Sequence, residues 1–151
     1  MKKFSFSLER ILTLRQQAED ERRRALGEVE RRIYAERSQL ESLEGQRQSE
    51  QQAIREVGSG GSLNVRRVID GRAYQAGLQV RIARSLEALR SLAVERQNRM
   101  NEYIEARKRR RVLEKLRERK YRQWREETER EERMELDEVA GVGHRRRHGG
   151  S

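Results

Sequence analysis

The two histidines are the side chains best suited to metal or acid–base chemistry, and both lie in the last eight residues. His144 and His148 are four positions apart, but three arginines separate them. Because positive neighbours oppose the binding of a cation, we predict no metal site. The chain has no cysteine, which removes thiolate nucleophiles and thiolate metal ligands.

A glycine-rich stretch at residues 58–62 is the next candidate for chemistry, since such loops can hold phosphates. Its sequence is Gly-Ser-Gly-Gly-Ser, which lacks both the lysine and the preceding strand of a phosphate loop. No serine sits in the turn that exposes a hydrolase nucleophile. We therefore predict a protein that is not an enzyme and has no cofactor.

Binding to an anionic partner fits the composition better, since the formal net charge is +10. Four consecutive cations at residues 108–111, with Tyr121 and Trp124 downstream, could follow a nucleic-acid backbone. The cations nevertheless spread around the helix and acidic residues follow at once, and no base-reading fold is visible. Nucleic-acid binding is the less favoured alternative.

The elements that carry these residues are predicted to be long helices. The chain has no proline and 41% charged residues, and good helix formers dominate it. We predict an all-α fold in which two long antiparallel helices, residues 5–57 and 64–139, form a two-stranded coiled-coil hairpin over residues 1–140. Residues 58–62 would reverse the chain and Ser62 or Asn64 would cap the second helix. Residues 141–151 would form a disordered basic tail.

The apolar spacing predicts which residues form the seam between the helices. In the first helix the predicted positions are Leu8, Ile11, Arg15, Ala18, Arg22, Ala25, Val29, Ile33, Glu36, Leu40, Leu43, Arg47, Glu50, Ile54 and Val57. Two successive four-residue steps from Ala25 to Ile33 would insert an eleven-residue repeat. In the second helix they are Tyr74, Leu78, Ile82, Leu86, Leu89, Ala93, Arg96, Met100 and Tyr103, and the seam thins beyond.

Folding back at residues 58–62 places Phe4 near Arg117 and leaves residues 118–138 without an intramolecular partner. The charge changes sign there. Residues 107–125 contain eleven basic and two acidic residues, and residues 126–138 contain eight acidic and two basic residues. This bipolar end is either a docking surface of complementary charge or a solvated face with internal ion pairs.

Two terminal blocks resemble a known family. The start is Phe-Ser-Phe-Ser-Leu-Glu-Arg-Ile-Leu-Thr-Leu-Arg at residues 4–15, and the second block is Arg-Met-Glu-Leu-Asp-Glu-Val-Ala at residues 133–140. Both are similar to the flagellar export protein FliJ family. The resemblance implies a coupling stalk and general chaperone of the flagellar type III export apparatus, monomeric when free. Its partners would be the pore of the hexameric export ATPase, the cytoplasmic domain of the membrane export gate and export chaperones. It would lie in the cytoplasm, at the inner membrane below the flagellum.

The resemblance and the unpaired end together give two sets of candidate contact residues. For the ATPase they are Phe4, Phe6, Leu8, Ile11, Leu113, Trp124, Glu131, Glu132, Met134, Glu135, Asp137 and Glu138, with Trp124 as an apolar anchor and the carboxylates facing basic ring residues. For the gate they are Gln39, Leu43, Gln46, Tyr74 and Leu78. Gln46 and Glu50 stand where some relatives carry aromatic residues. The equivalent stalk of a virulence-type secretion system and a generic coiled-coil scaffold stay open as alternatives.

Overall fold

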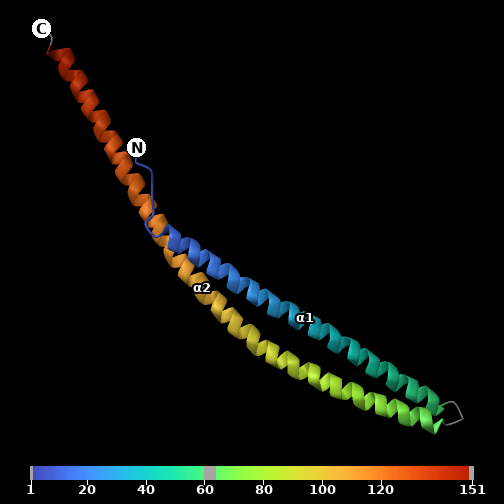
Figure 1. Cartoon of the computed structure of the whole chain (residues 1–151). Helices are drawn as coiled ribbons and strands as arrows, with labels where there is room; N and C mark the ends of the chain where they lie inside the picture. The colour runs from blue at the N-terminus through green and yellow to red at the C-terminus, as the bar shows by residue number, and fades with distance from the viewer. Residues whose placement is uncertain (1, 60–63, 150–151) are drawn as a thin grey trace. The chain divides into compact units, whose positions relative to one another are not determined.

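The protein consists of two long helices, as the composition predicts. The computed structural model describes residues 2–59 and 64–149. Helix α1 runs from Glu9 to Ser59 and helix α2 from Val65 to His148, and no strand occurs among the described residues (Figure 1). The all-α prediction is therefore confirmed. Within the described ranges, neither helix is apolar over a length that would cross a membrane.

The helix ends differ from the predicted ends by one to nine residues. Helix α1 begins at Glu9 and not at residue 5, so residues 2–8 are left outside it. Helix α2 begins after Asn64, whose Oδ1 accepts a hydrogen bond from the backbone N–H of Arg67 at 3.2 Å, as expected of a capping residue. Of the predicted reversal, Gly58 and Ser59 belong to α1 and residues 60–62 lie outside the described residues.

The C-terminal end of α2 differs most from the prediction. We expected the helix to end near residue 139 and a disordered tail to follow, whereas the structure continues α2 to His148. The last turn carries Arg145, Arg146, Arg147 and His148. Cations in this position interact favourably with the negative end of the helix dipole and with its unpaired carbonyls. This contribution favours helix through the two glycines at 141 and 143.

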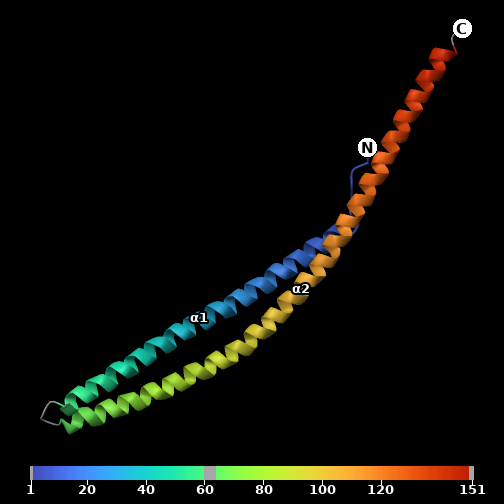
Figure 2. The same ribbon diagram turned by 180° about the vertical axis from the view of Figure 1, so that it is seen from behind.

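Two compact units make up the chain, and each contains part of both helices. The turn unit is Glu21–Ile104 and the terminal unit is Met1–Asp20 with Glu105–Ser151. In the turn unit, α1 and α2 run side by side in both views (Figures 1 and 2). Their direction is antiparallel, because Arg22 pairs with Glu102 at 3.2 Å while Glu50 pairs with Arg67 at 2.7 Å.

The apolar core of the turn unit is a cluster of three buried side chains, Leu43, Leu78 and Ile82, against which Leu40 packs. Leu78 is only 1% exposed. Leucine and isoleucine at these four positions follow the heptad spacing that the sequence predicts, and burial of such side chains is the main favourable term in a two-helix seam.

The buried residues differ from the predicted ones where either of two adjacent residues could face the other helix. In α1, Leu12 and Leu26 are buried, and each lies one position after the predicted Ile11 or Ala25. Leucine removes more apolar surface from water than alanine, which favours the shift at residue 26. The three-and-four spacing then continues from residue 12 through 15, 19, 22, 26 and 29. The predicted eleven-residue insertion is therefore wrong.

A similar correction applies to α2, where Ser85 and Leu92 are buried and the predicted Leu86 is 41% exposed. Burial of the serine hydroxyl is possible because its Oγ donates a hydrogen bond to Glu36 Oε1 at 2.6 Å. Hydrophobicity alone favours Leu86 at this position. Residue 85 faces α1 because it continues the four-and-three spacing of Leu78 and Ile82.

Candidate functional site

An N-terminal segment, residues 2–6, contacts α2 in the terminal unit, and we call it the strap. Its Phe4 ring lies 5.2 Å from the ring of Tyr121 in an edge-to-face arrangement and 5.8 Å from the ring of Trp124, measured between ring centroids. Arg117 places its guanidinium 5.6 Å from the centre of the Phe4 ring. We call Phe4, Tyr121 and Trp124 the aromatic clasp. Edge-to-face pairs and cations over ring faces are favourable geometries.

The strap reaches Tyr121 and Trp124 because its backbone is not helical. An extended chain advances about 3.3 Å per residue, whereas a helix advances about 1.5 Å. The backbone N–H of Glu9 donates to the carbonyl of Phe6 at 3.1 Å where the strap enters α1. Phe6 itself is buried. A helix starting at residue 5, as we predicted, would have covered less of α2.

The strap also lies against acidic residues of α2, which corrects the prediction that residues 118–138 have no partner within the chain. Two lysines of the strap face a row of glutamates across one hollow. Its lining is Lys2, Lys3, Ser5, Trp124, Glu127, Thr128, Glu131, Glu132 and Glu135. Beyond it, Leu136, Val139 and Val142 are exposed on α2.

Below the clasp, the seam of the terminal unit is held by ion pairs. Arg117 Nε donates to Glu9 Oε2 at 2.8 Å. Arg110 pairs with both Glu19 and Glu114, and Glu19 is only 5% exposed. The predicted seam contains Ala18 and omits Glu19. An uninterrupted heptad count from Leu12 would have found Glu19 as the opposing charge.

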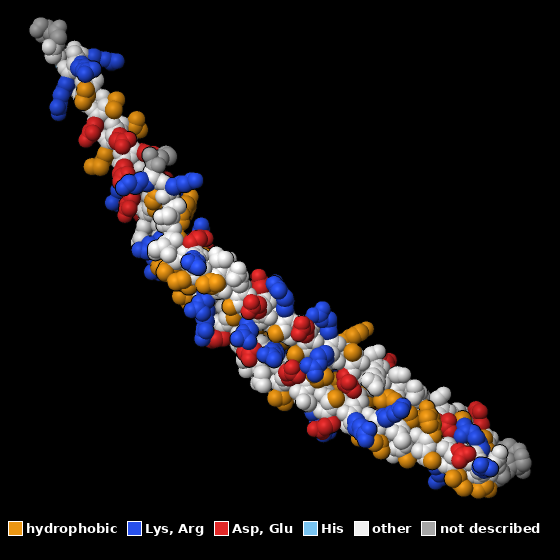
Figure 3. All heavy atoms as spheres, viewed as in Figure 1, with side chains coloured by type: hydrophobic (Ala, Val, Ile, Leu, Met, Phe, Trp, Pro, Cys, Tyr) orange, Lys and Arg blue, Asp and Glu red, His pale blue; other side chains and the backbone are white. Residues whose placement is uncertain are grey.

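The candidate ATPase-contacting residues fall into three groups by exposure. Phe6 is buried, and Phe4, Leu8, Leu113, Trp124 and Glu132 are half-buried. The exposed ones are Ile11, Glu131, Met134, Glu135, Asp137 and Glu138. Figure 3 shows acidic and hydrophobic side chains together along this end of α2 and basic side chains near its C-terminus. The exposed set is the part available to a partner in this state of the chain.

The candidate gate-contacting residues divide between core and surface. Leu43 and Leu78 pack against each other in the core of the turn unit, where they position the neighbouring side chains. Gln39, Gln46 and Tyr74 are exposed. The Tyr74 hydroxyl donates to Gln46 Oε1 at 3.5 Å, which joins the two helices at the surface. A contact with a partner here would use the polar and aromatic residues and not the two leucines.

A close approach of the helices lies beside this surface, and the sequence reading missed it. Gly71 is buried, and a Cβ added to it would lie 2.7 Å from Glu50 Oε1 and 3.0 Å from Ile54 Cδ1. The hydrogen bond from Arg67 holds the pKa of the Glu50 carboxyl below its usual value, and the charge of Arg67 adds to the effect. The same contact raises the pKa of Arg67. The position of Gly71, seven residues before Leu78, is the feature of the sequence that indicates this close approach.

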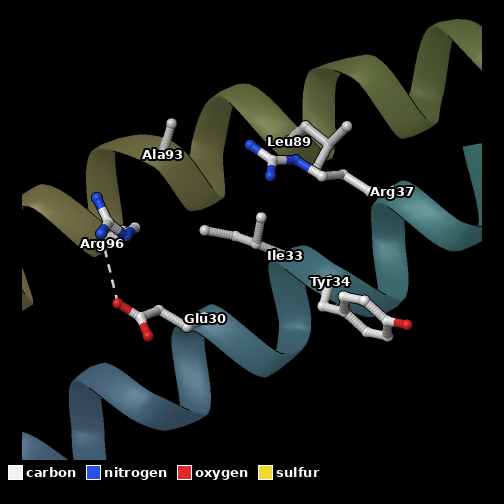
Figure 4. A pocket seen from close by; sticks show the side chains of 7 residues that line it. All are labelled: Glu30, Ile33, Tyr34, Arg37, Leu89, Ala93 and Arg96. Atoms are coloured by element: carbon white, nitrogen blue, oxygen red, sulfur yellow. Dashed lines mark hydrogen bonds and ion pairs between the residues drawn. The ribbon is translucent and has the colours of Figure 1, made fainter.

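A shallow groove in the turn unit is a further surface that the sequence did not indicate. In Figure 4, Ile33 projects between the helices beside Leu89, and Arg96 pairs with Glu30 at 3.4 Å across the groove. Tyr34, 78% exposed, and Arg37 complete the α1 side. The groove joins apolar and cationic groups, and it contains no pair of groups arranged for acid–base chemistry.

The histidines lie near the C-terminal end of α2, with ring centroids 4.3 Å apart. No group of three metal-ligating side chains occurs in residues 2–59 and 64–149. The described chain thus offers contact surfaces as its candidate sites.

Comparison with known proteins agrees with the resemblance of the terminal blocks. The family described as flagellar FliJ protein matches residues 4–149. A solved structure of CT670 from Chlamydia trachomatis, described as a candidate YscO homologue, is similar with a TM-score of 0.59 and 17% identity. The match covers 99% of this chain and 100% of that one. A comparison with curated proteins finds no match.

The structural likeness, at this low identity, concerns the fold of two long paired helices. The family match extends from the strap through both helices to the C-terminal turn of α2, so it includes both terminal blocks and the seam between them. This chain therefore belongs to the flagellar FliJ family, whose members are components of flagellar protein export.

Proposed function

We propose that the chain is a non-enzymatic coupling stalk of the flagellar type III export apparatus. Its terminal unit binds the central pore of the hexameric export ATPase, promotes assembly of the ring and raises its activity. Its turn unit contacts the cytoplasmic domain of the export gate through Gln39, Gln46 and Tyr74. The free chain is a monomer in the cytoplasm, associates with the inner membrane only through these partners and escorts export chaperones.

The observation that carries the ATPase contact is the acidic end of α2. Among the described residues, Glu127, Glu131, Glu132 and Glu135 make no ion pair. Met134 and Leu136 on the same segment are more than 60% exposed. Carboxylates that are not held in ion pairs steer a partner of opposite charge, and exposed apolar side chains supply area that binding can bury. A ring pore lined with basic and apolar residues fits this end.

The gate contact rests on a different kind of surface. Tyrosine supplies a large, partly apolar contact area with few rotatable bonds, and such residues are enriched where binding energy concentrates. Tyr74 is half-exposed above the firmly packed Leu43–Leu78 pair, so its backbone is held in place before a partner arrives.

Truncation tests the ATPase contact. A chain ending at Arg125 keeps the aromatic clasp and both helices of the turn unit and loses the acidic end. We expect it to keep its thermal transition and to lose stimulation of the purified cognate ATPase. A truncated chain that binds and stimulates like the full-length protein would remove residues 126–151 from the contact.

Trp124→Ala tests the anchor. Truncation of such anchors costs about 2 kcal/mol, which is about a thirtyfold weaker Kd. Tyr34→Ala is the matched control, because Tyr34 is an exposed aromatic residue of the turn unit. Equal affinities of the two variants for the ATPase would contradict the role of Trp124.

The equivalent stalk of a virulence-type secretion system is the second candidate, because the likeness to a candidate YscO homologue shows that the fold is shared. The family match favours the flagellar assignment. A pull-down with the flagellar export ATPase, with a virulence-type ATPase as competitor, distinguishes the two. Preferential capture of the virulence-type enzyme would reverse the assignment.

A further inference from the structure

The strap contacts the same face of α2 that the proposed function assigns to the ATPase. Phe4 covers part of Trp124, and Lys2 and Lys3 lie across the hollow from Glu127, Glu131 and Glu135. The residues that would attract a basic and apolar partner are therefore already in contact with a basic and aromatic segment of the chain itself. The complementarity is of two kinds, ring to ring and cation to carboxylate.

The contacts between the strap and α2 are weak enough for another segment to replace the strap. Within residues 2–59 and 64–149, neither Lys2 nor Lys3 forms an ion pair, and no backbone hydrogen bond joins residues 2–6 to α2. One aromatic side chain and screened attraction between exposed charges hold the segment in place. At physiological ionic strength such attraction fades over about 8 Å. The buried Phe6 and the Glu9–Arg117 pair fix only its base.

We infer that the face of α2 from Tyr121 to Glu135 is a docking site for an extended segment in which cations precede an aromatic side chain. In the free protein the strap fills this site, and the partner presents a segment of the same chemistry and binds by displacing the strap. The identity of the partner, the ring ATPase, rests on the proposed function; the site and its specificity do not. Phe4 then acts as a competitor of the partner and not as a contact to it.

A test without any partner uses the single tryptophan of the chain, Trp124. The probe is a synthetic peptide with the sequence of residues 2–7, Lys-Lys-Phe-Ser-Phe-Ser, added in trans. The host is the full chain carrying Phe4→Ala, which leaves the clasp empty, and far-UV circular dichroism checks that it is folded. We expect saturable quenching or a shift of the Trp124 fluorescence, weakened by salt.

Two controls define the specificity. The wild-type chain should bind the peptide about tenfold more weakly or worse, because its own strap competes. A peptide in which both lysines are glutamate should not bind, since it would face four carboxylates. Equal binding to wild type and Phe4→Ala, binding of the acidic peptide, or no response to any peptide would each overturn the inference.

The ATPase arm separates this inference from the proposed function. With the strap released, Phe4→Ala should bind the hexameric ATPase about fivefold more tightly than wild type. Weaker binding of Phe4→Ala would make Phe4 a direct contact and refute displacement while the proposed function stands. No binding by wild type or variant would refute the proposed function, and the peptide titration would still decide on the site.

Discussion

The turn unit and the terminal unit are built from the same two helices but are held together by different chemistry. The turn unit packs leucine and isoleucine into a dry cluster around Leu78. The terminal unit has in its place an ion pair between the buried Glu19 and the half-buried Arg110, together with the aromatic clasp. Apolar packing is non-directional and strong in water, whereas ion pairs and single ring contacts gain little over hydration. The comparison suggests a permanent hairpin at one end and exchangeable contacts at the other.

The core of the turn unit should be the most sensitive to mutation. Leu78→Ala removes a side chain that is 1% exposed and should cost about 2 to 5 kcal/mol of unfolding free energy, through lost burial and the cavity it leaves. Leu86→Ala is the control, because Leu86 is exposed and should change the stability by less than about 1 kcal/mol. Thermal melts followed by circular dichroism measure both. Equal destabilisation would restore Leu86 to the seam.

A smaller effect is expected from the ion pair of the terminal unit. Glu19→Gln leaves Arg110 with a weakened partner in a largely buried position and should cost about 1 to 3 kcal/mol. Replacing both residues with leucine should recover the loss, because an apolar pair avoids the desolvation of two charges. Urea melts of the single and double variants provide the measurement. A double variant less stable than the single would show that the pair stabilises the fold itself.

Two glycines of α2 in the turn unit differ in the space around them. Gly77→Ala meets nothing within 4 Å and should stabilise the helix by about 1 kcal/mol. Gly71→Ala should gain less, because its new methyl group must displace the ends of the Glu50 and Arg67 side chains. Chemical denaturation of the two variants gives the difference. An equal gain would mean that this ion pair moves aside without cost.

The smallest effect is a pH dependence of the same contact. The pKa of Glu50 is lowered in the folded state by its hydrogen bond with Arg67. Its contribution is present above the ordinary glutamate pKa of about 4.3 and is lost as the pH falls through the lower folded value. The melting temperature of wild type should therefore drop more than that of Glu50→Gln as the pH falls below about 4. Parallel curves would contradict this.

The sequence predicted the helices, the antiparallel pairing and the Leu40, Leu43, Leu78 and Ile82 core, because leucines at heptad spacing leave one helical face to bury. The prediction of buried residues from the sequence was wrong where either of two adjacent residues could face the other helix. At Ser85 and Glu19, hydrogen bonding and pairing across the helices decided the outcome, and hydrophobicity alone points to Leu86 and Ala18. Long-range partners of polar residues are not visible in a local period.

The strap was missed for a similar reason. The pattern from Phe4 to Leu8 is compatible with a helix, and helix propensity favours starting early. The extended conformation is favoured by contacts of Phe4 with Tyr121 and Trp124, more than a hundred residues away in the sequence. Without those contacts, residues 118–138 look unpartnered, and Trp124 looks like a free anchor.

Charge reversal at the acidic end of α2 tests whether the terminal unit docks in the ATPase ring. Glu131→Lys with Glu135→Lys reverses two carboxylates that line the hollow of the terminal unit. Glu41→Lys with Glu44→Lys makes the same change in net charge at exposed positions of the turn unit. Binding to the purified hexameric export ATPase should weaken at least about tenfold for the first pair and stay unchanged for the second. Equal affinities of the two double variants would contradict the docking of the terminal unit in the ATPase ring.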